Sequence, residues 1–210
     1  MHHSWAKDRL YISDSWRVQL VKTKRVVIVG IPGVGKTTVV TEVVKQLEQK
    51  NINLENLTFG TIMFNEAQKL GISNRDEMRR LSVNEQKNFQ IKAAETIAKI
   101  NSDVVIIDTH LFIKTNSGYM PGLPKDILDY LLPTHLVLVE AEPQDVLNRR
   151  ENDPTRKRDS ATIDSIELDN QIARSMLSSS GVLTGASVFI TLNQEGKSEA
   201  AAKSIVDFLI

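Results

Sequence analysis

The residues of this chain with the clearest chemical potential form a glycine-rich stretch, Gly30-Ile31-Pro32-Gly33-Val34-Gly35-Lys36-Thr37. The stretch matches the pattern G-x-x-x-x-G-K-[ST] at every fixed position. It follows an apolar run at residues 26–29 and precedes a segment, residues 38–49, with helical periodicity. Glycines let the backbone turn its N–H groups toward phosphate oxygens, and the positive end of a following helix adds to that field. We therefore expect a phosphate-binding loop rather than an ordinary glycine-rich turn.

Two side chains of this loop suit a nucleoside triphosphate and its metal ion. Lys36 would reach the β- and γ-phosphates of a nucleoside triphosphate, and Thr37 would ligate Mg²⁺. Asp108 ends a second apolar run, residues 104–107. A carboxylate at the end of such a strand can hold Mg²⁺ directly or through water. A helix-capping or loop aspartate is the alternative, but the loop at residues 30–37 favours the metal.

Arginine gathers in the polar stretch at residues 149–159, which Pro154 interrupts. Phosphoryl transfer needs positive charge over the transferring group, and a guanidinium supplies a planar fork of donors. The stretch follows the fourth apolar run, so it could fold over the phosphate-binding loop as a lid. A solvated surface loop is the alternative, because most runs of charge are solvated.

A second basic cluster lies at residues 75–80, where Arg75 and Arg79 are four residues apart and would share a helix face. They could bind an acceptor phosphate, or they could pair with Asp76 and Glu77, and the sequence leaves both interpretations open. His110, two residues past Asp108, could contact an acceptor or serve as a hydrogen-bonded loop histidine.

Other polar residues are interpreted as structural. We expect Asn65, Glu66 and Gln68 to form a solvated helix face and assign them no role. His135, which opens an apolar run, is interpreted as a packed residue.

The composition narrows the class of protein. The chain has 210 residues, with 26 basic and 26 acidic side chains and no cysteine. Balanced charge argues against a dedicated nucleic-acid binder, and the lack of cysteine excludes disulfides and thiolate metal sites. No apolar run is long enough to span a membrane, and the N-terminus lacks the apolar core of a signal peptide. We expect a cytoplasmic enzyme with no membrane or nucleic-acid partner.

The elements that must position these residues follow from five apolar runs, near residues 26, 57, 105, 137 and 189, which alternate with helical segments. This pattern predicts an α/β fold of three layers, a five-stranded parallel sheet with helices on both faces. Helices are predicted over residues 35–49, 61–100 (with breaks at 71–74 and a capping signal at 82–85), 124–131, 143–150, 163–180 and 197–209. Residues 114–122 are predicted to be a loop.

Ligands of such sheets bind at the carboxyl ends of the strands, so we expect Gly30, Gly60, Asp108 and Glu140 along one edge. Residues 1–24 precede the first strand and contain both tryptophans, Trp5 and Trp16. Their apolar content favours packing against the body or a neighbouring subunit. We therefore divide the chain into an N-terminal extension, residues 1–24, and a phosphate-loop kinase domain, residues 25–210.

The chain resembles the archaeal type of adenylate kinase from Arg25 to the C-terminus. The resemblance is carried by the segments at residues 30–38, 59–64 (FGTIMF), 74–79 (NRDEMR), 107–110 (IDTH), 114–124 (KTNSGYMPGLP), 155–159 (TRKRD) and 181–186 (GVLTGA). It implies reversible transfer from ATP to AMP, giving two ADP, with Mg²⁺. It also implies a monophosphate-binding subdomain near residues 60–100, a short lid near 151–160, and a homotrimer. The extension at residues 1–24 and Asn116, where proline is more usual, depart from the family pattern.

The resemblance and the residues suggest the same roles for the site. The groups that would hold the donor nucleotide are Gly30, Gly33, Val34, Gly35, Lys36, Thr37, Thr38 and, near the adenine, Asn193. The groups expected on the acceptor side are Gly60, Thr61, Arg79 and His110. The expected catalytic residues are Lys36, Arg149, Arg156 and Arg158, and the expected metal ligands are Thr37 and Asp108.

Two other functions are compatible with a phosphate-binding loop. One is a kinase for a different nucleoside monophosphate, which would differ only in its acceptor pocket. The other is an ATPase that assists RNA or ribosome assembly, for which the basic residues of the extension are the one attraction. A guanine-specific enzyme is not expected, because the chain lacks an Asn-Lys-x-Asp motif.

Overall fold

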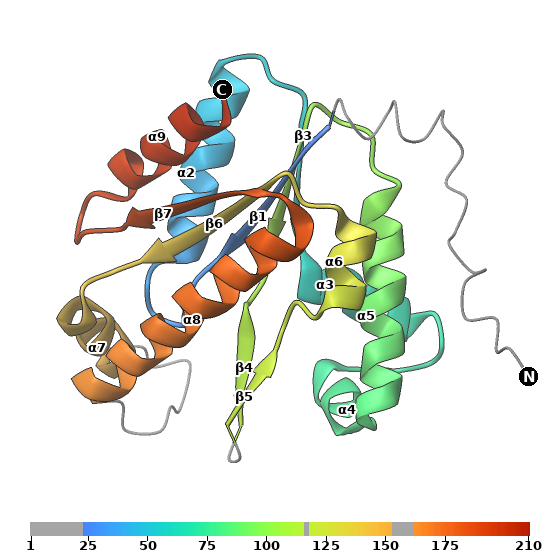
Figure 1. Ribbon diagram of the computed structural model, residues 1–210. Helices are drawn as coiled ribbons and strands as arrows, with labels where there is room; N and C mark the ends of the chain where they lie inside the picture. The colour runs from blue at the N-terminus through green and yellow to red at the C-terminus, as the bar shows by residue number, and fades with distance from the viewer. Residues whose placement is uncertain (1–22, 116–117, 153–161) are drawn as a thin grey trace, which may run out of the picture.

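The computed structural model describes residues 23–115, 118–152 and 162–210, with Arg79 described by its backbone alone. Their elements alternate along the chain as the apolar runs predict (Figure 1). The strands are β1 (Lys24–Val29), β2 (Leu54–Thr58), β3 (Val104–Asp108), β4 (Phe112–Thr115), β5 (Gly118–Pro121), β6 (His135–Glu140) and β7 (Ser187–Leu192). The helices are α2 (Lys36–Gln49), α3 (Phe59–Gln68), α4 (Arg75–Arg80), α5 (Val83–Ala98), α6 (Lys125–Leu131), α7 (Pro143–Glu151), α8 (Ile163–Thr184) and α9 (Ser198–Leu209).

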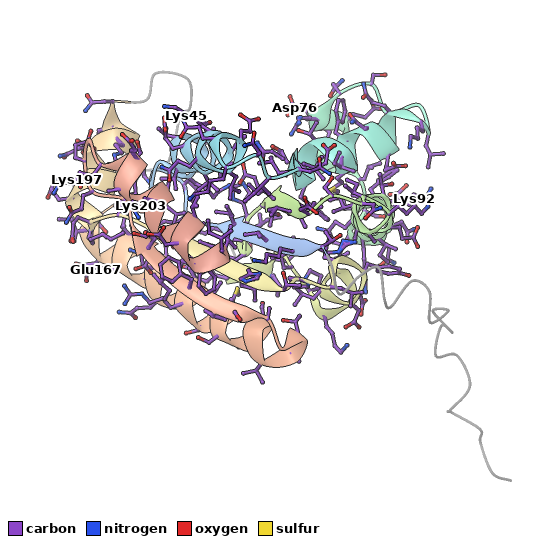
Figure 2. The ribbon with its side chains drawn as sticks, turned by 90° about the horizontal axis from the view of Figure 1, so that it is seen from above. Lys45, Asp76, Lys92, Glu167, Lys197 and Lys203 are labelled. Carbon is purple, nitrogen blue, oxygen red and sulfur yellow. The ribbon has the colours of Figure 1, made fainter. Side chains whose placement is uncertain are left out.

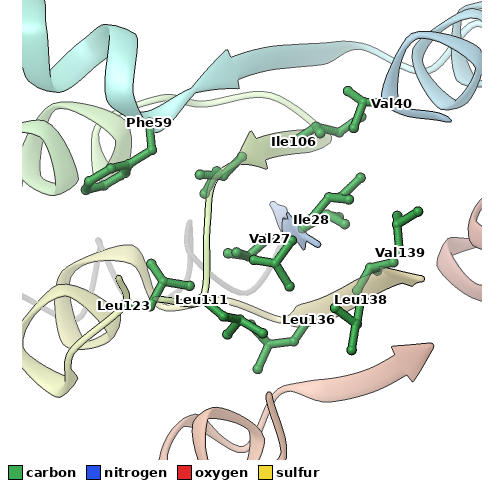
Figure 3. Packing of buried hydrophobic residues seen from close by; sticks show 14 of the residues in the cluster. Val27, Ile28, Val40, Phe59, Ile106, Leu111, Leu123, Leu136, Leu138 and Val139 are labelled. Carbon is green, nitrogen blue, oxygen red and sulfur yellow. The ribbon is translucent and has the colours of Figure 1, made fainter. Parts of the chain in front are cut away.

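The main sheet has five parallel strands in the order β2-β3-β1-β6-β7, which confirms the predicted fold class. Helices α2 and α9 pack together on one face, and α8 crosses the other (Figure 1). Central strands are buried on both sides, so they consist of continuous apolar runs. Val27 and Ile28 of β1 lie in the middle of this core, with Ile106 and Leu138 on the flanking strands (Figure 3).

The charged surface is mixed in sign. Viewed from above, Lys45, Asp76, Lys92 and Glu167 project from the helices that surround the sheet (Figure 2). Several surface cations are paired within one helix, such as Lys203 with Asp207. In the part of the chain that the structure describes, no helix is long and apolar enough to cross a membrane.

The predicted helical region after β2 divides into three helices at the expected breaks. Asn74 caps α4 by accepting a hydrogen bond from the backbone N–H of Glu77. Ser82 and Glu85 form a capping box at the start of α5. Each cap satisfies backbone N–H groups that have no partner within a helix, so the chain starts a new helix at each of these points.

Three expectations about the elements need correction. Residues 112–121 form an antiparallel hairpin, β4–β5, where a loop was predicted for residues 114–122. The prediction rested on the turn-forming residues at the tip of the hairpin and missed the pairing of its two strands. The Phe112 ring packs edge-on against the Tyr119 ring, with 4.9 Å between the ring centres. Helix α8 continues past the predicted end at residue 180 to Thr184. Gly181 lies inside this helix and does not end it. A glycine is needed there because a Cβ would lie 2.5 Å from the Val188 side chain.

The third correction concerns Glu66, which was expected on a solvated face. It is 9% exposed, and its carboxylate accepts hydrogen bonds from Lys69 and Thr96, which joins α3 to α5. The expected packed role of His135 agrees with its edge-on contact with Phe208. The N-terminal extension falls outside the described residues, except Thr23 and Lys24. Thr23 is buried and Lys24 begins β1, so the folded core starts slightly before residue 25.

Candidate active site

The phosphate-binding loop leaves the central strand β1 and ends at the first turn of α2. Three consecutive carbonyl groups of the loop accept hydrogen bonds from side chains behind it. Arg150 Nε donates to Pro32 O at 2.8 Å, Arg149 Nη1 to Gly33 O at 3.4 Å, and Asn193 Nδ2 to Val34 O at 2.7 Å. In a trans peptide the N–H points opposite to the carbonyl. These donors therefore turn the N–H groups of Gly33 and Gly35 away from themselves, while the N–H of Val34 donates to Ile31 O at 3.4 Å.

Two glycines of the loop have backbone angles that favour glycine. Gly33 has φ +95° and Gly35 has φ +80°. A side chain at Gly35 would also stand 2.5 Å from Asn193 Nδ2. Gly30 is required for a different reason, since a Cβ there would meet the carbonyl of Val139 at 2.7 Å. The motif glycines thus allow both the turn of the loop and its close packing on β6 and Asn193.

Lys36 and Asp108 come together at the carboxyl edge of the sheet. Asp108 ends β3, which pairs directly with β1, and its carboxylate forms an ion pair with the Lys36 ammonium. Their side chains are 11% and 15% exposed. Burial lowers the pKa of Lys36 to about 8, because desolvation disfavours the charged ammonium. A poorly solvated cation at the end of the loop is a strong partner for an anionic ligand.

The residues at this edge suit a hard divalent cation. Thr37 is exposed at the start of α2, and Asp108 ends the neighbouring strand. A hydroxyl and one carboxylate match the preference of Mg²⁺ for few protein oxygens together with substrate phosphates. Among the described residues there is no cluster of three or more His, Cys, Asp or Glu side chains that could hold a metal.

The end of α7 brings two arginines to the loop. Arg149 donates from Nε and Nη2 to Glu195 Oε2, at 2.9 and 2.5 Å, in addition to its bond with Gly33. Arg150, with a side chain 10% exposed, packs closely enough that a Cβ at Gly33 would lie 3.1 Å from its Cγ. The predicted lid arginines Arg156 and Arg158 lie outside the described residues.

The expected acceptor side begins where β2 passes into α3. Gly60 and Thr61 are in the first turn of α3, and Arg75 Nη2 donates to Thr61 Oγ1 at 3.0 Å. The Arg75 guanidinium also lies 5.5 Å from the centre of the Phe64 ring. Of the two arginines that the sequence left open, Arg75 is therefore the one that the structure places at Thr61, while the side chain of Arg79 is not described. His110 is exposed, just past Asp108.

Sequence reasoning missed a buried carboxylate, Asp169 on α8, which is 4% exposed. Its Oδ1 accepts from Lys114 Nζ at 3.0 Å and from Tyr119 OH at 2.7 Å, and its Oδ2 lies 4.0 Å from Arg150 Nη2. A signal was present, because Asp169 falls on the buried stripe of α8 with Ile166, Ala173 and Leu177. An acidic residue on an apolar stripe is normally paired.

Glu140, which was expected at the carboxyl edge of the sheet, has a structural role as the partner of Arg174. It is 5% exposed, and both of its oxygens accept from Arg174, at 2.7 and 2.6 Å. Its backbone carbonyl accepts from the N–H of Asn193 at 2.7 Å. Glu140 thus supports the segment that carries Asn193 to the phosphate-binding loop.

Comparisons with known proteins agree with this geometry. A family profile described as an AAA domain matches residues 29–167. Among solved structures, a shikimate kinase from Bacteroides thetaiotaomicron superposes with a TM-score of 0.54 at 13% identity, over 89% of this chain and 98% of that chain. A shikimate kinase from Aquifex aeolicus gives 0.51 at 16% identity, over 88% and 95%. These likenesses show the fold alone.

Curated relatives are much closer in sequence. Adenylate kinases of Sulfurisphaera tokodaii and Thermoplasma acidophilum are each 42% identical to this chain, over 88% and 87% of it and over 98% and 96% of the relatives. The adenylate kinase of Methanocaldococcus jannaschii is 39% identical, over 90% of this chain and all of that protein.

A parallel sheet with a phosphate-binding loop at its carboxyl edge defines a phosphate-loop nucleotide-binding fold. Within that class the chain belongs to the adenylate kinase family, and so to the nucleoside monophosphate kinases.

Proposed function

We propose that this chain catalyses the reversible, Mg²⁺-dependent transfer of a phosphoryl group from ATP to AMP, which yields two ADP. The observation that carries the proposal is the placement of Lys36 and Asp108 beside a loop whose carbonyls are held from behind. The relatives that share its sequence over nearly their whole length are adenylate kinases, which supports AMP as the acceptor.

The donor side would bind the triphosphate through backbone and side chain together. The backbone N–H groups of Gly33 and of residues 35–38 would face the phosphates, and the Lys36 ammonium would exchange Asp108 for the β- and γ-phosphate oxygens. Thr37 and Asp108 would hold Mg²⁺, which neutralises charge on the phosphates and orients them. Thr38 completes the first turn of α2, and Asn193, fixed beneath Val34, is proposed to lie near the adenine.

The acceptor side would be built from the helical insertion. Gly60 permits close approach of the nucleotide to α3, Thr61 and Arg79 bind the monophosphate, and His110 lines the far side of the site. The Arg75–Thr61 hydrogen bond supports this placement, since it brings a guanidinium to the first turn of α3. We propose residues 60–100 as the monophosphate-binding subdomain.

Transfer itself needs position and charge rather than a general base, because the attacking phosphate oxygen is already anionic. Arg149 reaches the loop from α7, and we propose that Arg156 and Arg158 close over the transferring group as part of a lid at residues 151–160. These cations would offset the charge that develops between the two nucleotides.

A coupled assay tests the proposal across AMP, CMP, GMP and UMP, with ATP and Mg²⁺. We expect rapid formation of ADP with AMP and much slower reaction with the other three. Preference for another monophosphate would instead identify a kinase for that nucleotide. Hydrolysis of ATP without transfer to AMP would contradict the proposal and favour an ATPase.

We also propose that the chain forms a homotrimer and works in the cytoplasm, where its adenine nucleotides are found. The edge strand β7 supports self-association. Val188, Ile190 and Leu192 on one face of β7 are 41–43% exposed, and Val182 nearby on α8 is 86% exposed. An apolar edge strand is a favourable site for pairing with another chain.

A further inference from the structure

Asp169 connects three parts of the molecule that are distant in sequence. Its carboxylate holds Lys114 and Tyr119, which are paired across the β4–β5 hairpin, and it faces Arg150 at the end of α7. The hairpin follows β3 directly and extends beyond the edge of the sheet where the site lies (Figure 1). One buried carboxylate therefore joins the β4–β5 hairpin to the helix that supports the phosphate-binding loop.

Arg150 in turn contacts the phosphate-binding loop. Its Nε donates to the carbonyl of Pro32 at 2.8 Å, and its stem lies against Gly33. The hydrogen bond fixes the Pro32–Gly33 peptide plane and so the direction of the Gly33 N–H. A shift of Arg150 would turn one of the N–H groups that face the phosphates.

The charges explain why Asp169 is needed for this arrangement. Arg150 is nearly buried and Lys114 is half-buried, so two cations converge on a single carboxylate that is 4% exposed. Without that charge the two cations would still repel each other, and Arg150 would lose its attraction to α8. Removing one partner of a buried ion pair is unfavourable, so Arg150 would shift and weaken its hydrogen bond to Pro32.

We propose that Asp169 is a positioning residue for phosphoryl transfer: it holds Arg150 against the Pro32 carbonyl and ties the β4–β5 hairpin to the same point. The role in transfer rests on the proposed function. The structural part, control of the phosphate-binding loop through Arg150, does not depend on which acceptor is used.

The first experiment measures amide hydrogen exchange of the nucleotide-free full-length protein, in a peptide that covers residues 26–38. We expect Asp169→Asn to speed exchange in the loop, and Arg150→Gln to do the same. Asp129→Asn is the matched control, because Asp129 is an exposed residue of α6 that pairs with Lys125 in the same helix, and it should leave the loop unchanged. Faster exchange confined to α8 and the hairpin, with the loop unaffected, would overturn the proposal.

The second experiment is kinetic. We expect Asp169→Asn to lower kcat for ADP formation by about 10- to 100-fold, as a small misplacement of reacting groups does, with KM for AMP changed less than about threefold. The double variant with Arg150→Gln should be no slower than the slower single variant, within about twofold, because both act on one contact. Losses that multiply, or a kcat within twofold of the parent, would refute a role through Arg150.

If Asp169→Asn does not fold, Arg150→Lys decides the question from the other end. The lysine keeps a positive charge for Asp169 but has no Nε to donate to Pro32. We expect faster loop exchange with little change in melting temperature, and unchanged exchange would overturn the proposal. A parent protein that makes no ADP from ATP and AMP would refute the proposed function, while the exchange result would still stand by itself.

Discussion

At the scale of single residues, the site depends on a few groups whose surroundings alter their chemistry. Lys36 is the clearest case, since burial weakens its hold on the proton while Asp108 occupies its ammonium. A nucleotide that binds here must displace that carboxylate and restore a full positive charge. The energy of nucleotide binding and the protonation of Lys36 are therefore linked.

Replacement of Lys36 by methionine should remove this cation while preserving the apolar stem. We expect kcat to fall on the order of 100- to 1,000-fold, since the lost donor is the one proposed to bind the transferring phosphates. Circular dichroism should show an unchanged fold. Turnover near that of the parent protein would exclude Lys36 from the mechanism.

The lowered pKa of Lys36 predicts how the rate depends on pH. In the free enzyme the ammonium loses its proton as pH rises through about 8, so kcat/KM for ATP should decline above that value. Bound phosphates favour the ammonium, so the decline in kcat should come at higher pH, because kcat reports on the complex.

Calorimetry near pH 8 in buffers of different ionisation enthalpy checks the same linkage. ATP binding should take up protons in the parent protein and not in Lys36→Met. Equal proton uptake by both proteins would assign the titration to another group.

At the scale of elements, helices and strands begin and end where short-range chemistry directs. The capping boxes at Ser82 and at Thr162 set the starts of α5 and α8, and both involve residues within one turn. Such signals can be found in sequence because donor and acceptor are three residues apart.

Removal of the Ser82 hydroxyl tests how much one such cap contributes. Ser82→Ala should lower the free energy of unfolding by about 1 kcal/mol, or roughly 2–4 °C in melting temperature for a chain of this size. Ser179→Ala is a matched control, because Ser179 is exposed within α8 and its hydroxyl only bonds back to Ser175. Equal melting temperatures for Ser82→Ala and the control would show that the box contributes nothing.

The difference between local and long-range interactions explains which elements could be predicted from the sequence. The central strands β1, β3 and β6 follow from apolar runs, because burial on both faces demands continuous apolar sequence. The edge strands β2 and β7 are partly exposed, and their sequences carry a weaker form of the same signal. The hairpin could not be predicted in this way, since each arm is only four residues long and is ordered by pairing with the other arm and by Asp169. The contacts of Asp169 span 50 residues or more to the hairpin, and no local pattern encodes such a distance.

The candidate site divides along similar lines. The phosphate-binding loop, Lys36 and Asp108 were predictable because the motif and the strand end define them. The side chains that donate to the carbonyls of the loop were only partly predictable. Arg149 and Asn193 were expected near the nucleotide, but Arg150 was not given a role, because its contact with Pro32 depends on how α7 packs.

At the scale of the whole molecule, the order of the strands gives β1, β2 and β7 different roles: β1 carries the phosphate-binding loop, β2 leads into the helical insertion, and β7 forms an exposed edge. The strand that carries the phosphate-binding loop is protected on both sides by β3 and β6. At the edges, β7 presents aliphatic side chains to the surroundings and β2 leads into the helical insertion.

A charge on the exposed face of β7 tests the proposed self-association. Ile190→Lys should convert a trimer to single chains without loss of the fold, because the lysine would be buried without a partner at an interface. Light scattering after size exclusion reports the mass. The exposed Ile113→Lys on the hairpin is a control, and a parent protein that is already a single chain would refute the trimer.

The attachment of the insertion to an edge strand has a consequence for how such enzymes diversify. β2 pairs only with β3 within the main sheet, and the helices that follow it carry Gly60, Thr61 and Arg75. Changes in these helices leave the β1 hydrogen-bonding partners and the supports of the phosphate-binding loop in place. Substitutions in the proposed acceptor helices can therefore alter the choice of acceptor without disturbing the proposed ATP-binding loop.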